Sequence, residues 1–285
     1  MYKFSTIGLI VKKNDISVSE TLNDVHTKLA ATGLPVLMEH STRGLIGGIS
    51  TVNIEEICRS CDLAIVIGGD GTLLGAVRQL VDHDIPIIGV NRGRLGFLVD
   101  VSPDRELGAL DAILAGEYTE EYRFLLSCEV IRDGSSVYQA NAFNDTVIHS
   151  RTLDMLGFDT FIDGEFVHRQ RADGFIVSTP SGSTAYALSS GGPIIHPSME
   201  AIVLLPICPH TLSSRPIVIS SHSTVEIKVH KEDACNAQVV NDGQDALDLK
   251  VGDTVRITRK PKPARLIHPP HYDYYEILRV KLKWG

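Results

Sequence analysis

The sequence has little of what would indicate a disulfide-stabilised, membrane-spanning or nucleic-acid-binding protein. Its 285 residues include only five scattered cysteines, an odd number that does not suggest a disulfide framework. No apolar run approaches the roughly 18 residues that a membrane helix needs. The formal net charge of −8 argues against a broadly basic surface for nucleic acid. The N-terminal segment is unlike a signal peptide, so we expect a cytoplasmic protein that binds neither membrane nor nucleic acid.

Several motifs for metal and nucleotide chemistry are also missing. Cys58 and Cys61 form a C-x-x-C with no second pair, which favours semi-buried residues of a reducing cytosol over a redox or zinc site. No H-E-x-x-H spacing occurs, and His268 and His271 flank two prolines, which indicates a turn. No G-x-x-x-x-G-K-[ST] occurs either, which excludes a P-loop enzyme. We therefore expect no metal held by the protein's own side chains.

Residues 1–121 alternate short apolar runs with amphipathic segments. This alternation predicts an α/β domain with a Rossmann-like parallel sheet covered by helices on both faces. Ligands of such sheets bind beyond the carboxyl ends of the strands. The predicted strands are 7–11, 35–38, 63–67 and 85–90, and the predicted helices are 17–31, 72–81 and 103–114.

Residues 122–261 follow a different pattern, with period-two alternation at 225–230. Asp133-Gly134, Asp163-Gly164 and Asp242-Gly243 each separate strand-like runs, as in tight hairpins. This region is predicted to be a mainly antiparallel β domain. The basic segment 256–265 contains two prolines and fits a strand end and linker better than a phosphate-binding strip. The tail 262–285 returns to helical spacing and is expected to complete the first domain.

A glycine-rich loop follows the predicted strand 63–67. Gly68-Gly69-Asp70-Gly71-Thr72 is a turn that opens a helix, and such a turn lets a phosphate approach backbone N–H groups. Gly69, Gly71 and Gly75 also fit a loose dinucleotide fingerprint, which alone is weak. Asp70 is more informative, since a carboxylate repels phosphate. We favour a role in accepting a proton or holding Mg²⁺ over helix capping, because Thr72 could cap equally well.

The next strand leads into a second glycine loop, Asn91 to Leu98. Arg92 and Arg94 lie among its glycines and either offset phosphate charge near Asp70 or are exposed surface arginines. The residues alone leave both interpretations open.

Polar residues gather again in the second half. Five hydroxyl residues lie between Ser178 and Thr184, around Pro180 and Gly182, and Tyr186 follows. The hydroxyls suit a polar ligand, and Tyr186 could stack on a planar ring of that ligand. Alternatively, the segment is a Ser/Thr-rich capped turn with Tyr186 in the core. Asn144 and Asp145 follow a strand-like region, with His149 beyond. Their amide and carboxylate groups either hydrogen-bond to ribose hydroxyls or an adenine edge, or they form an Asx turn. Gln244 follows a hairpin turn.

These segments together resemble the NAD kinase family. The resemblance rests on GGDGTLL at 68–74, NRGRLGFL at 91–98, ND at 144–145, QRADGFIVSTPSGSTAYALSSGGPIIHP at 170–197 and PHTLSSRPIVI at 209–219. It implies an ATP-dependent kinase that phosphorylates the 2′-hydroxyl of the adenosine ribose of NAD to give NADP, with Mg²⁺ accompanying ATP. It also implies a homodimer or homotetramer whose NAD sites can draw on a neighbouring subunit.

The resemblance further assigns site residues. Asp70 would be the proton acceptor, and Phe97 would lie near the adenine. The phosphate would be approached by Gly68, Gly69, Gly71 and Thr72. The residues expected to contact NAD are Asp70, Gly71, Phe97, Asn144, Asp145, Arg171, Asp173, Thr184, Ala185, Tyr186, Ala187, Leu188, Ser189 and Gln244. Asp154 stands where many relatives carry Arg or His, so no residue is assigned to that contact.

Other classes stay open on the residues alone. A lipid kinase can share the glycine loop but needs an apolar entrance. A dehydrogenase should place an acid about 20 residues after its glycine loop, and Asp82, Asp84 and Asp100 fit this spacing poorly. An NAD-responsive binding module would hold NAD without needing Asp70. Acceptance of NADH, and polyphosphate as a donor in place of ATP, also stay open.

Overall fold

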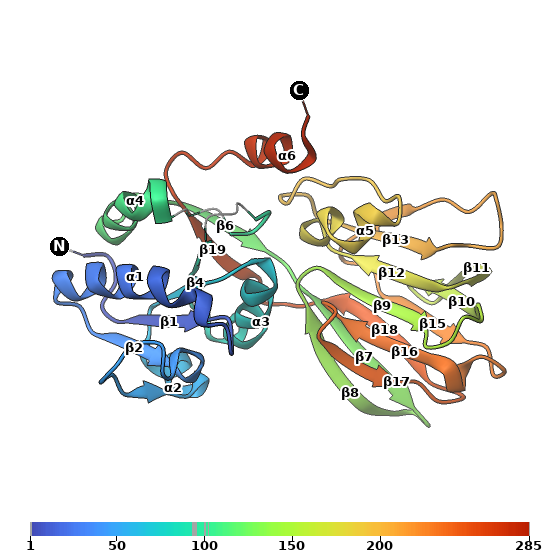
Figure 1. Cartoon of the computed structure of the whole chain (residues 1–285). Helices are drawn as coiled ribbons and strands as arrows, with labels where there is room; N and C mark the ends of the chain where they lie inside the picture. Colours follow the sequence, from blue (N-terminus) through green and yellow to red (C-terminus); the bar gives the residue numbers. More distant parts are fainter. Residues whose placement is uncertain (1, 93–95, 100, 102, 285) are drawn as a thin grey trace. The chain divides into compact units, whose positions relative to one another are not determined.

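The computed structural model describes residues 2–92, 96–99, 101 and 103–284, and the side chains of residues 103–107 and 235 lie outside that description. The chain divides into two compact units (Figure 1). The first comprises Met1–Tyr122 and Ala264–Gly285, and the second comprises Arg123–Pro263.

A seven-stranded sheet in the order β3-β2-β1-β4-β5-β19-β6 forms the centre of the first unit. Neighbours from β3 to β19 pair in parallel, which confirms the predicted Rossmann-like sheet. The strands are β1 (Ile7–Val11), β2 (Val36–Glu39), β3 (Thr51–Val52), β4 (Leu63–Ile67), β5 (Ile87–Val90), β6 (Thr119–Arg123) and β19 (Ala264–His268). The helices are α1 (Ser19–Thr32), α2 (Ile54–Ser60), α3 (Asp70–Leu80), α4 (Pro103–Ala115) and α6 (Tyr274–Leu282).

Helices cover both faces of this sheet (Figure 1). Successive side chains of a strand point to opposite faces. Accordingly, Ile7, Leu9 and Val11 of β1 share one core with apolar residues of α1 and α4. Gly8 instead faces α2, whose Ile57 and Cys61 would lie within 3.2 Å of a Cβ at that position. Burial on both faces explains why the central strand β4 is a continuous apolar run.

Four elements of the first unit differ from the sequence prediction. The strands β3 and β6 and the helix α2 were not predicted, and Cys58 and Cys61 lie at the end of that helix. The segment from Ala264 forms β19, which pairs with β5, where the sequence indicated a linker running to a turn. His268 ends this strand and is buried against Tyr272, with ring centroids 3.9 Å apart. The turn itself begins one residue later, where Tyr272 N donates to Pro269 O.

The second unit contains two six-stranded antiparallel sheets, in the orders β11-β10-β15-β18-β7-β8 and β14-β13-β12-β9-β16-β17. The prediction of a mainly antiparallel β region is confirmed. The strands are β7 (Leu126–Arg132), β8 (Ser135–Ala142), β9 (Asp145–Ser150), β10 (Leu156–Ile162), β11 (Glu165–Ala172), β12 (Gly174–Ser178), β13 (Ala201–Ile207), β14 (Ile217–Ser220), β15 (Val225–Val229), β16 (Ala237–Asn241), β17 (Asp245–Asp248) and β18 (Thr254–Arg259). One short helix, α5 (Tyr186–Ser189), follows β12.

The main core of the second unit lies between these sheets. Inward-facing residues of both sheets form it, including Phe158 of β10 and Phe175 of β12, whose ring centroids are 5.1 Å apart. A second apolar cluster, which includes Ile176 and Ala187, covers the other face of β12. The predicted hairpins are confirmed, since Asp133, Asp163 and Asp242 and the glycines after them all have positive φ.

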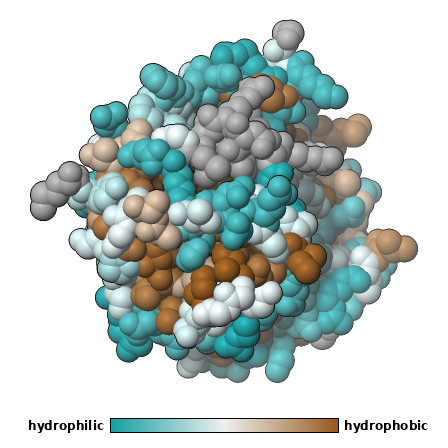
Figure 2. Space-filling model, turned by 60° about the vertical axis from the view of Figure 1, so that its left-hand side comes forward, coloured by the Kyte–Doolittle hydropathy of each residue, from teal (hydrophilic) through white to brown (hydrophobic). Residues whose placement is uncertain are grey.

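None of the described helices is long and apolar enough to cross a membrane. Hydrophilic residues cover most of the face seen in Figure 2, with hydrophobic residues gathered near its centre. Exposed apolar atoms are usual on folded proteins.

Candidate active site

The glycine turn lies where β4 ends and α3 begins. Gly68 N donates to Val90 O at 2.9 Å, and Gly69 is the N-cap of α3. Asp70 is the first helical residue and Gly71 the second, and Thr72 N donates to Gly69 O at 2.9 Å. The predicted glycine turn that opens a helix is therefore confirmed, and phosphate binding by this turn stays a prediction. A helix N-terminus attracts anions, so this turn suits a phosphate.

The carboxylate of Asp70 is held by the second glycine loop. Oδ2 accepts from Phe97 N at 3.0 Å, and Oδ1 accepts from Leu98 N at 3.1 Å. A Cβ at Gly96 would lie only 2.1 Å from Asp70 Oδ1, so the loop reaches the carboxylate because residue 96 is glycine. The two N–H groups fix the orientation of the Asp70 carboxylate, and Asp70 is not the cap of α3, since the N-cap residue is Gly69.

The aromatic ring of this loop contacts the C-terminal helix. Lys281 Nζ of α6 lies 5.4 Å from the centroid of the Phe97 ring, a distance at which a cation and a ring attract. The tail thus supports the segment that holds Asp70. Arg94, which the sequence analysis considered for phosphate contact, lies outside the described residues, whereas Arg92 is exposed.

In the second unit, Asp242 holds the Asn144-Asp145 pair in place. Its carboxylate accepts backbone N–H bonds from Phe143, Asn144 and Asp145 at 2.9, 2.7 and 3.2 Å. Asp242 itself follows β16 in a hairpin turn. Leaving such N–H groups unpaired on burial would cost about 1–3 kcal/mol each, so the carboxylate fixes the local backbone.

The hydroxyl-rich turn packs directly against the same pair. Thr179 N donates to Asn144 O at 2.9 Å, and Thr179 Oγ1 donates to Phe143 O at 2.6 Å. A Cβ at Gly182 would lie 2.1 Å from Asn144 O, so only glycine allows this approach. The Asn144-Asp145 pair and the hydroxyl-rich turn, which the sequence indicated separately, therefore pack against each other.

These segments border a cavity of about 350 Å³. Tyr186, about half exposed, lies at its wall, and two carboxylates line it. The full lining is Asn144, Asp145, Val147, His149, Ala185, Tyr186, Val240, Asp242 and Gly243. Four predicted NAD contacts line it, namely Asn144, Asp145, Ala185 and Tyr186. Four lining residues had no predicted role in a site, namely Val147, Val240, Asp242 and Gly243, and Asp242-Gly243 was predicted only as a turn beside Gln244.

Other predicted contacts lie outside this lining. Arg171 and Asp173, at the β11–β12 junction, are exposed. Arg171 O accepts from His210 N at 2.9 Å. Ala187 is buried in the apolar cluster beneath the turn, so its side chain serves packing. The remaining predicted contacts of this unit border the same turns but not the cavity, and they are Thr184, Leu188, Ser189 and Gln244.

The acid–base behaviour of Asp145, one of the carboxyls that line the cavity, is altered by its surroundings. Burial, followed by the charge of the neighbouring Asp242, raises the pKa of the Asp145 carboxyl to about 7. Near neutral pH the Asp145 carboxyl is therefore present in both its neutral and its ionised form, and it can donate or accept a hydrogen bond.

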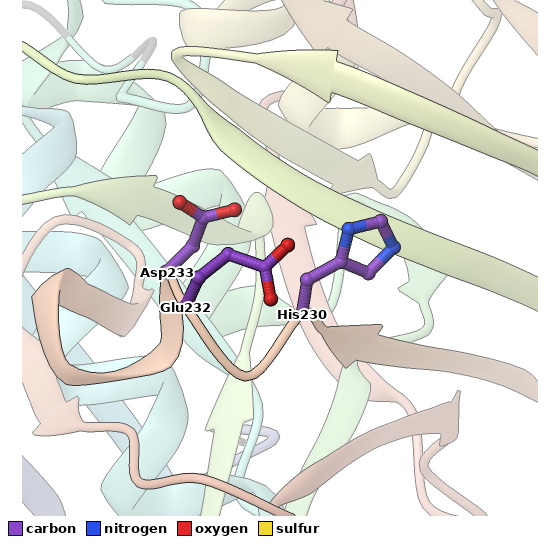
Figure 3. Close-up of side chains that lie close together, drawn as sticks. All are labelled: His230, Glu232 and Asp233. Carbon is purple, nitrogen blue, oxygen red and sulfur yellow. The ribbon is translucent and has the colours of Figure 1, made fainter.

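One group of side chains in the described part of the chain could hold a metal ion. His230, Glu232 and Asp233 follow β15, and their ligand atoms lie within 4.8 Å of one another (Figure 3). His230 Nε2 also lies 3.2 Å from Asp159 Oδ1, and Asp233 Oδ2 accepts from Gly157 N at 2.8 Å. These contacts fasten the turn to β10. The expectation of no metal held by the chain's own residues stays a prediction.

Comparison with known families covers most of the chain. The ATP-NAD kinase N-terminal domain matches residues 7–118, and the ATP-NAD kinase C-terminal domain matches residues 143–269. This chain belongs to the NAD kinase family. The resemblance inferred from the sequence is confirmed, and with it the class of enzyme, an ATP-dependent NAD kinase.

Individual members of the NAD kinase family match over nearly the full length. The NAD kinase of Acinetobacter baylyi is 48% identical over an alignment 285 residues long, which covers 99% of this chain and 92% of that protein. Yeast NADH kinase, solved with NADH, has a TM-score of 0.90 at 26% identity, covering 99% of this chain and 88% of the yeast chain. An NAD kinase from Archaeoglobus fulgidus, solved with ATP, has a TM-score of 0.74 at 27% identity, covering 98% and 97%.

Proposed function

We propose that this chain transfers the γ-phosphoryl group of Mg-ATP to the 2′-hydroxyl of the adenosine ribose of NAD, giving NADP and ADP, with Asp70 as the general base. The observation that carries this assignment is the position of Asp70. Its carboxylate lies at the first turn of α3, directly after the glycine turn, and two backbone N–H groups orient it. A plain dinucleotide-binding loop has no use for a carboxylate in this place.

In the proposed step, Asp70 accepts the proton of the ribose 2′-hydroxyl while the oxygen of that hydroxyl attacks the γ-phosphorus of ATP. The glycine turn, with Gly68, Gly69, Gly71 and Thr72, offers backbone dipoles and the positive end of α3 to the transferred group. Phosphoryl transfer depends mainly on such positioning and charge stabilisation. The dipoles are in place before the reaction, so they need no reorganisation during it.

The cavity of the second unit supplies the proposed NAD contacts. Asn144 and Asp145 lie at the start of β9, where Asp242 fixes their backbone. Carboxylate and amide groups suit ribose hydroxyls or an adenine edge. Tyr186 suits stacking on a planar ring. Arg171, Asp173, Gln244, Phe97 and the run from Thr184 to Ser189 are proposed to complete the contacts by resemblance to the family.

We expect NAD binding to depend on pH through Asp145. If its ionised form accepts hydrogen bonds from NAD, the KM for NAD should rise up to about tenfold for each pH unit below 7, because the ionised fraction falls by that factor. Initial rates across about pH 5.5–8 measure this. Asp145→Asn should flatten the profile, whereas Asp163→Asn, in a hairpin turn of the same unit, should not.

The same pKa makes a prediction about stability. A folded-state pKa above the unfolded value of about 3.9 means that the folded protein holds a proton more tightly between about pH 4 and 7. Stability from this group is therefore lost as pH rises through that window. Asp145→Asn should raise the melting temperature more at about pH 8 than at pH 5. A retained pH slope in this variant would assign the titration to another group.

The reaction itself is tested by incubating the purified protein with NAD and Mg-ATP and reading NADP with glucose-6-phosphate dehydrogenase. We expect NADP to form and EDTA to abolish its formation, because the donor is the magnesium complex. NAD binding without NADP formation would favour a binding module.

The proposal also includes a homodimer or homotetramer in the cytoplasm. Free thiols at Cys58, Cys61, Cys128 and Cys208 are typical of a reducing compartment. Light scattering of the full chain would give the number of subunits.

A further inference from the structure

Three neighbouring parallel strands end together at one edge of the first unit's sheet. Val11 of β1 pairs with Ile67 of β4, and Ile67 pairs with Val90 of β5. The segments that follow therefore leave the sheet side by side, with the glycine turn in the middle. Neighbouring strands lie about 4.8 Å apart, which puts β1 and β5 about 10 Å apart. A side chain that joins the two outer segments has to pass the start of the glycine turn.

Arg92, two residues after β5, makes this connection. Its Nη1 lies 3.1 Å from Asp15 Oδ2 and also donates to Ser17 Oγ, and both partners belong to the segment after β1. Lys12 Nζ lies 3.4 Å from the same Asp15 oxygen. One carboxylate thus holds two cations beside the turn that is proposed to receive phosphate.

Asp15 is fixed in this position by its own turn. Its Oδ1 accepts from the backbone N of Ser17 at 3.0 Å and from the Ser17 hydroxyl, and it caps the short 3-10 helix Ile16–Val18. The hydrogen bonds from Ser17, with Lys12 and Arg92 beside them, hold the pKa of the Asp15 carboxyl below its usual value. A fixed anion therefore faces Arg92 in the free protein.

We propose that Arg92 and Lys12 bind the outer phosphates of the phosphoryl donor, and that Asp15 is an internal counter-ion that these phosphates replace. The inference rests on the proposed function and names the donor site within it. Guanidinium groups bind phosphate through parallel, charge-assisted hydrogen bonds, and a phosphate offers Arg92 more acceptor oxygens than the single Asp15 oxygen that it contacts in the free protein. Local cations are needed here because the chain as a whole carries a net charge of −8.

The proposal predicts opposite effects for the two partners. Arg92→Gln should raise the KM for Mg-ATP about tenfold or more, since it removes a charged hydrogen bond, and should leave the KM for NAD unchanged. Asp15→Asn keeps an acceptor for Ser17 N but removes the competing charge. It should lower the KM for Mg-ATP by up to about fivefold, the range of an exposed ion pair.

A pair that only ties two loops together behaves differently. Both variants would then loosen the same contact, and both would move the KM for Mg-ATP in the same direction. Arg59→Gln is the matched control, because Arg59 pairs with Glu56 at 3.0 Å in the same unit but on α2. It should leave both KM values unchanged.

Calorimetric titration with magnesium tripolyphosphate tests the site without turnover. We expect Asp15→Asn to bind the probe more tightly than wild type, and Arg92→Gln to bind it more weakly. Equal binding by all three proteins, or a shift in the same direction for both variants, would overturn the proposal. Failure of the proposed function would appear separately, as wild type that binds the probe but makes no NADP. If the Arg92→Gln variant does not fold, the comparison of probe binding by wild type and Asp15→Asn still tests the proposal.

Discussion

Replacing Asp70 by Asn should lower kcat by about 10²–10⁴, the usual contribution of a general base. The amide cannot accept the proton of the attacking hydroxyl. One amide oxygen can still accept from Phe97 N or Leu98 N, so the loop loses only part of its contact with residue 70. We therefore expect NAD binding and the fold to persist. Steady-state rates, NAD titration and thermal unfolding measure these three quantities.

Asp62 offers a matched control for this substitution. Its carboxylate also accepts backbone N–H bonds in the first unit, from Ser5 at 2.8 Å and Thr6 at 2.9 Å. Asp62→Asn should reduce stability in a similar way and leave kcat near the wild-type value. Similar kcat losses in both variants would mean that Asp70 acts through the fold and not as a base.

Replacing Gly96 by Ala should lower kcat about 100-fold without a comparable change in either KM. The added Cβ would lie 2.1 Å from Asp70 Oδ1 and 2.9 Å from its Cγ, so the carboxylate has to move. A displacement of about 1 Å at a catalytic group can cost a factor of about 10². The φ of Gly96 is not in the left-handed region, so the alanine backbone itself is tolerated.

Gly108→Ala is the control for this glycine substitution. Gly108 lies in α4 with open space around its Cα, and alanine favours a helix. It should leave kcat unchanged. If Gly96→Ala keeps wild-type turnover, the loop 96–98 does not position Asp70.

Local patterns were sufficient to predict the elements that depend on local physics. The apolar run Leu63–Ile67 followed by glycines predicted β4 and the turn into α3, because burial on both faces demands such a run. The Asp-Gly dipeptides predicted hairpins, because both residues adopt positive φ. The strand β19 was missed, since its pairing with β5 joins segments about 180 residues apart and leaves no local periodicity.

Site residues could be predicted from the sequence where their side chains give them their role. They were harder to predict where their role depends on contacts made in the folded structure. Asp70 stood out because a carboxylate is out of place in a phosphate turn. Its partners Phe97 and Leu98 act through backbone N–H groups, which any residue has, so their side chains give no signal. Asp242 appeared only as a turn residue, because its role is to accept N–H bonds from a segment about 100 residues away.

In the proposed reaction, Asp70 takes the proton from the 2′-hydroxyl of NAD as ATP transfers its phosphoryl group. NADP formation by wild type and Asp70→Asn, measured side by side with saturating NAD and Mg-ATP, tests it most directly. We expect steady NADP formation by wild type and a rate lower by a factor of about 10²–10⁴ in the variant, with NAD still bound. Near-normal NADP formation by Asp70→Asn would contradict it.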